Sequence, residues 1–488
     1  MSLSSAINTA QALLSNTAKQ TAIVSRNVAN SGNADYSDRQ AQLTTSFGGG
    51  SQIVTVQRAQ DAALLAQVLS GNSSSSAQDA LSKGLETLSD AMGGNDYENA
   101  PSTLIANLRD ALQTYSAQPS NVTSAQSAVL AAKDVANGLN NASATVQQVR
   151  SDADAQIATD VDSLNSLLSQ FQKANTAVVQ GTQAGTDVSD ALDQRDKLLK
   201  NISQYVGVDT VTGANNSMSI YTADGTTLFE TVPRTVSFTP TTNYADGVTG
   251  NQVLIDGVPL KAGTGANSTG QGSIQGLLQL RDDVAPQFQD QLDEVARGLV
   301  EAFKETDQST PATQPDMPGL FTWSGGDVPS SATVQTGIAA TISINAAVDP
   351  DQGGDPSLLR DGGINGAAYI SNTSDGTGYS DLINSYVSGL SASQSFDSSA
   401  GLDTNASLVD YSSNSLGWLE QFRSSASDAS TSKDALASRS QQALSNATGV
   451  SIDDEMSRLL DLEQSYKASA KMISTVNEMI GALMDAVS

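Results

Sequence analysis

Apolar residues at the start of the chain recur at alternating spacings of four and three, which places them along one face of a helix. The positions of this seam are Leu3, Ile7, Ala10, Leu14, Thr17, Thr21, Val24 and Val28. Two threonines and an alanine make the seam only weakly apolar, so we expect the helix to need a partner for stability. The polar segment 30–35 predicts the end of this helix.

A stronger seam runs through the last part of the chain with the same alternating spacing. Its positions are Leu459, Leu462, Tyr466, Ser469, Ile473, Val476, Ile480, Leu483 and Val487. Ser451 is positioned to cap the N-terminus of this helix, and the acidic residues 453–455 would stabilise it, because the N-terminal end of a helix carries a partial positive charge. Two amphipathic terminal helices of similar length predict pairing with each other, with other subunits, or both. The alternative is that each helix packs on its own domain.

The chain between these helices changes character at residue 207. Residues 75–205 have helical periodicity, and the stretch 122–181 reads as one long rod-like helix with a break near Gly138. Beyond residue 207, short runs rich in β-branched residues alternate with turn signals, which predicts a small inserted β domain. The predicted strands are 208–212, 217–222, 227–232, 235–239 and 252–255.

The second half of the chain returns to helical periodicity over 274–303, followed by a Pro- and Gly-rich zone with short strands within 333–344. Residues 367–445 are again helical, interrupted by a flexible loop near 391–408. We therefore predict an elongated, mainly α protein with an inserted β domain. Its predicted parts are a terminal coiled-coil domain (1–60 and 446–488), a helical rod (61–206, 274–310 and 366–445), a β-rich insert (207–273) and an irregular insert (311–365).

The composition narrows the possible functions. The chain of 488 residues has 24 Lys and Arg against 52 Asp and Glu, a formal net charge of −28, which argues against nucleic acid and anionic membranes as partners. It has no His and no Cys, which excludes a His general base, a Ser-His-Asp triad, a thiolate nucleophile, His or Cys metal ligands, and disulfides. No targeting segment and no apolar stretch of about 18 residues is visible, so no membrane span is expected.

Catalytic and ligand-binding motifs are missing from the sequence as well. It contains neither Gly-x-Ser-x-Gly nor a Gly-Lys dipeptide, so neither a hydrolase elbow nor a Walker A loop is present. Residues 349–355 resemble a calcium loop, but Arg360 stands where such a loop needs a bidentate Glu. We therefore expect a protein without enzymatic activity, cofactor or metal.

The two chain ends resemble those of bacterial flagellar axial proteins. The N-terminal resemblance is carried by Asn27-Val-Ala-Asn30 and by Tyr36-Ser-Asp-Arg-Gln40, in which Asp38 is an extra residue relative to the usual pattern. A turn that usually reads Thr-Pro-Gly is replaced here by residues 33–35. The segment 463–479 is similar to the C-terminal end of the same proteins. These two matches are shared by rod, hook and junction proteins.

Two interior motifs separate these classes. Residues 191–199, which contain Asp193-Gln-Arg-Asp196, resemble the pattern of the flagellar hook-associated protein 1 family. Residues 276–282, which end in Leu-Arg-Asp, resemble the same family, and residues 342–356 give a weaker match. The interior motifs favour this family over the hook protein or a flagellin-like filament subunit, which remain alternatives. A further alternative is a surface adhesin whose binding face lies on the insert at 208–270.

The resemblance implies a structural protein outside the cell, in the ring that joins the flagellar hook to the filament. Its implied partners are further copies of itself, the hook protein, and a second junction protein with flagellin on the other side. It also implies export through the flagellar type III channel without a cleaved signal peptide, and a cytosolic chaperone bound to the C-terminal helix. We expect the terminal helices to fold on assembly. The residues predicted to mediate assembly between subunits are Leu14, Val24, Asn27, Val28, Asn30, Tyr36, Leu462, Tyr466, Ile473, Val476, Ile480 and Leu483.

Overall fold

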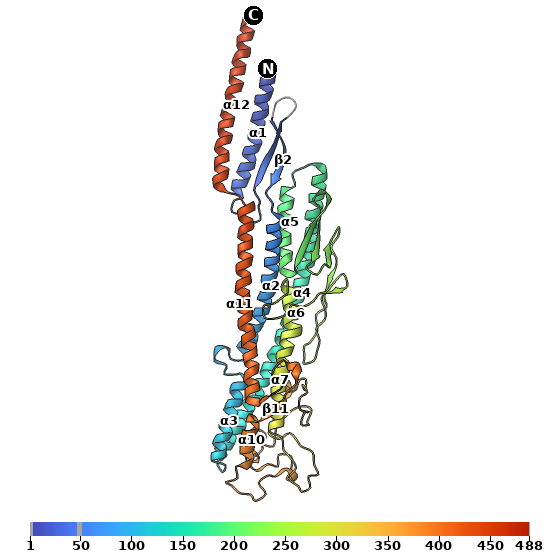
Figure 1. Ribbon diagram of the computed structural model, residues 1–488, viewed down its shortest axis with the longest axis vertical. Coiled ribbons are helices and arrows are strands. Elements are labelled where there is room, and N and C mark those ends of the chain that lie inside the picture. The colour runs from blue at the N-terminus through green and yellow to red at the C-terminus, as the bar shows by residue number, and fades with distance from the viewer. Residues whose placement is uncertain (1–2, 46–50, 488) are drawn as a thin grey trace.

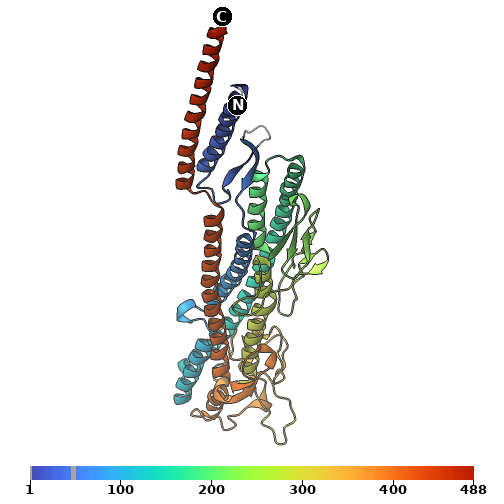
Figure 2. The same ribbon diagram turned by 45° about the horizontal axis from the view of Figure 1, so that its top comes forward.

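The protein is a long, narrow molecule with most of its helices parallel to the long axis (Figure 1). The computed structural model describes residues 3–45 and 51–487. Both chain ends lie at the same end of the molecule, as Figure 2 also shows from another direction. The elongated, mainly α architecture with small inserted sheets agrees with the sequence prediction.

The two terminal helices form an antiparallel pair at this end. Helix α1 spans Leu3–Ala29 and helix α12 spans Ile452–Val487, and the far end of α12 extends beyond the start of α1 (Figure 1). Beside them lies a two-stranded hairpin, β1 (Arg39–Thr45) and β2 (Ser51–Arg58), which the sequence analysis did not predict. In its antiparallel register Arg39 lies opposite Arg58.

The helical body is built around α4 (Val122–Ala184), whose 63 residues span about 95 Å. The predicted break near Gly138 is wrong, because the helix continues through it. A Cβ atom at Gly138 would lie 2.3 Å from Cδ1 of Leu104, so the glycine lets α3 approach closely. Helices α2 (Ala62–Ala91), α3 (Pro101–Ala117) and α5 (Ser189–Tyr205) pack against α4, and α11 (Leu408–Thr448) packs mainly against α2.

The predicted β insert is present as two three-stranded sheets beside α4. One has the order β3 (Val208–Thr212), β4 (Met218–Thr222), β5 (Thr227–Phe229), and the other β6 (Val236–Ser237), β7 (Leu254–Ile255), β8 (Val258–Pro259). The strands expected at 227–232 and 235–239 are only three and two residues long. Pro233 and Pro240 flank them, and proline cannot donate to a ladder. Phe229 packs edge-on against Phe171 of α4, with ring centroids 5.0 Å apart.

The expected helix over 274–303 is present as α6 (Ser273–Gln279), a π-helical turn (Leu280–Val284) and α7 (Ala285–Ala302). The far end of the body holds short elements. These are β9 (Phe321–Thr322), α8 (Ile338–Thr341), β10 (Ser343–Ile344), α9 (Leu358–Asp361), α10 (Asp381–Ser391), β11 (Ser393–Ser395) and β12 (Asn405–Ser407). Only the last part of the expected strand region 333–344 is extended, because α8 precedes it.

The flexible loop expected near 391–408 is instead an ordered hairpin of β11 and β12. Phe396, between the strands, is buried and stacks on Tyr411 of α11 with ring centroids 3.8 Å apart. The Ser- and Asp-rich composition concealed this one aromatic anchor.

One continuous apolar core fills the helical body. Its buried members run from Leu69 to Ala426, and among the described residues it includes none from α1 or α12. The terminal helix pair therefore stands outside the main core. In the part of the chain that the structure describes, no helix combines the length and apolar character that crossing a membrane requires.

Candidate assembly site and its joint to the helical body

The two predicted seams face each other inside the terminal helix pair, which we define as α1 and α12. On α1, Ala10, Thr17 and Val24 are buried, and Leu14 and Val28 are half-buried. Among the seam positions of α12, Ser469 and Val476 are buried, and Leu459, Leu462, Ile473 and Ile480 are half-buried. The side chains of Leu3 and Val487 lie outside the described part. The weak seam of α1 thus finds a partner within the same chain.

Two of the predicted assembly residues on α12 are not covered by α1. Tyr466 is 51% exposed and Leu483 is 58% exposed. They are part of a larger set of exposed large apolar side chains on this helix, which we call the exposed face of α12. Its members are Ile452, Met456, Leu460, Tyr466, Met472, Met479, Leu483 and Met484. Exposed apolar side chains in this number on one helix are typical of a contact site.

Asn27 and Tyr36, also predicted as assembly residues, belong to a buried polar cluster at the base of the pair. Asn27 is fully buried, and its Nδ2 donates to Oδ1 of Asp38 (2.7 Å), to O of Arg39 (2.9 Å) and to Oε2 of Glu455 (3.0 Å). Its Oδ1 accepts the Tyr36 hydroxyl at 2.8 Å. Asn27 therefore ties the end of α1 to the start of α12.

The other residues of the N-terminal motif have separate roles. Half-buried Asn30 donates from Nδ2 to the backbone oxygen of Arg26 and so closes the last turn of α1. The extra residue Asp38 accepts from Asn27 through its carboxylate, and its backbone N–H donates to O of Thr448 at 2.8 Å. Asp38 thereby links the N-terminal segment to the end of α11.

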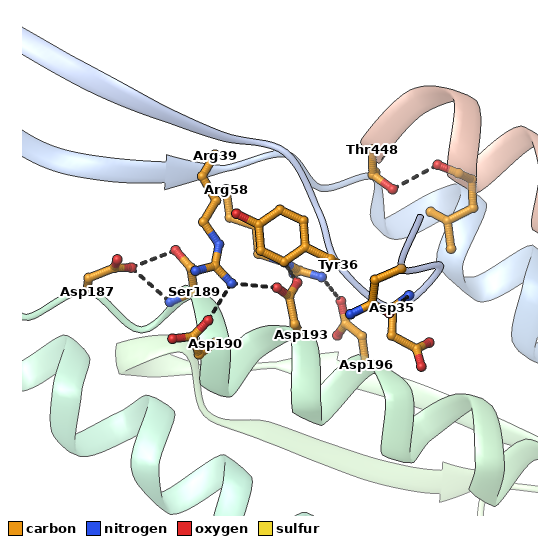
Figure 3. Close-up of polar contacts among 12 residues, drawn as sticks. Asp35, Tyr36, Arg39, Arg58, Asp187, Ser189, Asp190, Asp193, Asp196 and Thr448 are labelled. Atoms are coloured by element: carbon orange, nitrogen blue, oxygen red, sulfur yellow. Dashed lines mark hydrogen bonds and ion pairs between the residues drawn. The ribbon is translucent and has the colours of Figure 1, made fainter. Parts of the chain in front are cut away.

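An ion cluster holds the hairpin β1–β2 on helix α5 (Figure 3). Asp193 receives both hairpin arginines: Nη2 of Arg39 lies 2.8 Å from its Oδ2, and Nε of Arg58 lies 2.6 Å from its Oδ1. Nη2 of Arg39 also forms an ion pair with Oδ1 of Asp190 at 2.6 Å, and Nη2 of Arg58 forms one with Oδ2 of Asp196 at 2.5 Å. Because Arg39 and Arg58 are paired in the hairpin register, one carboxylate reaches both.

The environment of Arg39 favours its charged form. The side chain is 2% exposed, and its guanidinium lies 4.5 Å from the centre of the Tyr36 ring. Burial alone lowers the pKa of Arg39, but the hydrogen bonds to Asp193 and Asp190 outweigh it, so the pKa is raised. Burial also raises the pKa of the Tyr36 hydroxyl.

The Asp-Gln-Arg-Asp motif binds a second partner through its arginine. Arg195 is 4% exposed, and its Nη1 donates to Oδ1 of Asn175 on α4 (3.2 Å) and to O of Asn216 in the turn between β3 and β4 (2.5 Å). Burial lowers its pKa. The motif thus connects the hairpin, the helical body and the β insert. The roles of these residues could not be predicted from the sequence, because the partners of Asp193 lie 154 and 135 positions away and those of Arg195 lie on other elements.

A cavity of about 1470 Å³ opens where the terminal helix pair meets the helical body. We call this region, residues 30–38, 59–61 and 449–451, the joint. The cavity is lined from the N-terminal side by residues such as Tyr36 and Arg58, and from the body by Leu192 and Leu444. The joint is therefore loosely filled and is bridged mainly by polar contacts.

Comparisons with known proteins agree with the motifs. Residues 85–311 match the profile described as flagellar hook-associated protein FlgK helical domain, and residues 440–486 match that of the flagellar basal body rod FlgEFG protein C-terminal. Flagellar hook-associated protein 1 of Bacillus subtilis is 23% identical over 98% of this chain and 96% of its own length. The protein of the same name from Escherichia coli is 29% identical over 61% of this chain and 55% of its own length.

A solved structure of the flagellar hook junction protein FlgK from Burkholderia pseudomallei is similar over 53% of this chain and 46% of that one, with a TM-score of 0.41 and 20% identity. The first profile covers the segment with both interior motifs, and the second covers α12. The Bacillus subtilis alignment runs through nearly the whole of both chains. The chain is similar to the flagellar hook-associated protein 1 family, and this similarity supports a structural role at the junction of hook and filament.

Proposed function

We propose that this protein forms a ring at the junction of hook and filament, in which the terminal helix pairs of neighbouring copies contact one another. The similarity to that family supports a structural role at this junction. The ring and the contacts that close it are the proposal. A head-to-tail contact of this kind closes or continues according to its rotation, and the end of the hook would supply the template.

The exposed face of α12 is the observation that carries the proposal. The seam of α12 is already satisfied by α1, yet Met472, Met479, Leu483 and Met484 remain 45–68% exposed. Complete burial of a fully exposed side chain of this kind is worth about 1.5–3 kcal/mol, so covering the half that is still exposed is worth about 1 kcal/mol for each. A neighbouring copy that covers several of them gains enough to offset the ordering of both surfaces.

The remaining partners are those that the resemblance to the hook-associated protein 1 family implies. We propose that hook protein lies on one side of the ring and a second junction protein, followed by flagellin, on the other. Before export, a cytosolic chaperone would cover α12, because exposed apolar surface otherwise promotes aggregation. Export would use the flagellar channel without a cleaved signal peptide.

Deleting the gene tests the role. Bare hooks together with unpolymerised flagellin in the medium are the expected result. Hookless cells would assign the protein to the hook or rod instead, and normal filaments would refute a junction role.

Complementation of the deletion strain tests the surface. Leu483→Glu should leave the cells without filaments, because it places a charge on the exposed face without disturbing the contact with α1. Gln464→Glu is the matched control, since it adds the same charge at an exposed polar position of the same helix. Swimming cells with Leu483→Glu would show that this face is not the subunit contact.

A further inference from the structure

The last part of helix α11 extends beyond the apolar core of the helical body. Tyr411 and Leu419 anchor the first half of this helix in the core, and Ala426 is its last core member. We call residues 427–448 the arm of α11. It lies beside α2 and ends near the start of α12 (Figure 1), and most of its residues are half-buried or exposed. The main core therefore does not hold the arm in place.

The sequence makes α11 easiest to bend where the arm begins. Residues 424–432 contain six serines and threonines, which form helices less readily than alanine or leucine, because their side chains compete for backbone hydrogen bonds. The hydroxyl of Ser432 donates to the backbone oxygen of Asp428 at 2.9 Å. A bond of this kind, from a side chain to the preceding helical turn, often bends a helix.

The arm lies on α2 through small residues and partly exposed polar ones. A Cβ atom at Gly71 would lie 3.1 Å from Cα of Ala437, so the two backbones come close without large interlocking side chains. The hydroxyl of Ser430 donates to Oδ1 of Asp79 at 2.6 Å, and a similar bond one turn further along the helices is exposed. Water competes for such bonds, so they contribute little to holding the arm on α2.

Helix α2 is itself firmly fixed in the helical body. Helix α6 packs so closely on it that a Cβ atom at Gly276 would lie 2.2 Å from the backbone oxygen of Ala77. The N–H of Gly272 donates to the backbone oxygen of Ser73 at 2.7 Å, and Leu81 belongs to the core. If the two helices separate, the arm is therefore the part that moves.

One buried polar cluster connects the arm with α2. Nζ of Lys433 donates to Oε1 of Gln78 on α2 at 3.0 Å and to the backbone oxygen of Ser268 at 2.6 Å. Gln78 is fully buried, and its Nε2 donates to the backbone oxygens of Ala426 (3.0 Å) and Ala266 (2.8 Å). Its Oε1 also accepts the N–H of Ser268. Both donors and both acceptor positions of this amide are therefore used.

The cluster contributes position more than stability. The ammonium group of half-buried Lys433 donates to neutral oxygens rather than carboxylates, and burial lowers its pKa. Removing a charge from water without a counter-charge is costly, so such a group adds little net stability. Buried polar groups can instead select one arrangement among those that a weakly specified helix contact allows.

We propose that Lys433 pins the arm of α11 to α2, and that without its ammonium group the arm bends away from α2 while the rest of the helical body stays folded. The bend begins near Ala426, where the core ends within the serine-rich segment. Because the arm leads to the start of α12, its direction decides where the C-terminal segment leaves the body. The inference concerns the helical body alone, so it holds whether the terminal helices are folded or not.

The absence of cysteine in the sequence allows a direct test, because introduced cysteines then carry the only spin labels for pulsed electron paramagnetic resonance. The arm pair of labels is Gln67→Cys on α2 and Gln442→Cys on the arm. The core pair is Thr87→Cys on α2 and Gln421→Cys in the first half of α11. All four positions are exposed, and each pair lies at opposite points of the two antiparallel helices.

In the otherwise unaltered chain we expect one narrow distance for each label pair. Lys433→Met keeps the apolar stem and removes the charge, so the arm pair should show a broad distribution shifted to longer distances, while the core pair stays narrow. Residue 442 lies about 24 Å along the helix from Ala426, so even a small bend there displaces its label measurably. Lys83→Met, the same substitution at an exposed position of α2, is the matched control and should change neither distance.

Three results would overturn the proposal. The first is a narrow, unshifted distance for the arm pair in Lys433→Met. The second is an equally broad distance for the core pair in that variant, since the helical body as a whole would then have loosened. The third is the same broadening of the arm pair in Lys83→Met or in the unaltered chain. Circular dichroism of each labelled variant reports whether its helices are retained.

Discussion

Replacing Asp293 with asparagine should change the stability of the helical body in a way that depends on pH. Asp293 of α7 is fully buried, and its carboxylate accepts the backbone N–H groups of Gly337 (3.0 Å) and Ala339 (2.9 Å) at helix α8. Burial raises the pKa of this carboxyl to about 7, although the two backbone hydrogen bonds oppose the rise. The negative charge of Asp246 adds to it.

The sign and size of the effect follow from this pKa. A carboxyl whose pKa is higher in the folded than in the unfolded chain adds stability below its ordinary pKa, and that stability is lost as the pH rises through the folded value. The interval from 3.8 to about 7 corresponds to about 4 kcal/mol in the free energy of unfolding. The amide that replaces the carboxyl cannot ionise, and its single carbonyl oxygen serves the two N–H donors less well, at a cost of about 1 kcal/mol.

We therefore expect the Asp293→Asn variant to be less stable than the parent protein at pH 5, to recover about 3 kcal/mol relative to the parent between pH 5 and pH 7, and to change little relative to it above that. Urea unfolding followed by tryptophan fluorescence measures this, because Trp418 stacks on Phe288 of α7 with ring centroids 6.4 Å apart. Asp110→Asn on the surface is the control and should show no such trend. A stability difference between Asp293→Asn and the parent that is the same at pH 5 and pH 8 would refute the reasoning.

Two further substitutions test the packing of the helices. Ile473→Asp places a charge in the half-buried seam of the terminal pair, so junction assembly should be lost while the body keeps its thermal transition; normal incorporation into the flagellum would contradict this. Gly138→Val should destabilise the body by about 1–3 kcal/mol, because its Cβ would lie 2.3 Å from Leu104, and an unchanged midpoint of thermal unfolding would show that α3 moves aside freely.

Periodicity located the helices well because their apolar residues are also buried. Val24 and Val476 are positions at which the predicted seam and the observed contact coincide. The same periodicity assigned Tyr466 and Leu483 to that seam, although both are exposed. A heptad pattern shows that a face is apolar, but not how far along its length a partner covers it, and the far end of α12 extends beyond the start of α1. Which of these residues contact a second subunit remains a prediction.

The polar cluster at the joint could not be located from local patterns. Arg39 and Asp193 are 154 positions apart, and nothing near either residue reveals the other. Asn27 and Tyr36 were chosen because they lie in a motif at the chain end, yet their side chains are buried at the joint rather than aligned along the seam. The hairpin β1–β2 was missed for a related reason, since a two-stranded ribbon is marginal alone and here depends on its contacts with α1 and α5.

The hydrogen bond between Asn27 and Glu455 has a consequence for the order of folding. It joins positions 428 residues apart. Closing a loop of that length in an unfolded chain costs about 5 kcal/mol of conformational entropy. Once the body has formed, its ends already lie side by side, and only the short segments of the joint need to be ordered. The terminal helices should therefore pair last, and peptides corresponding to α1 and α12 alone should associate weakly in solution.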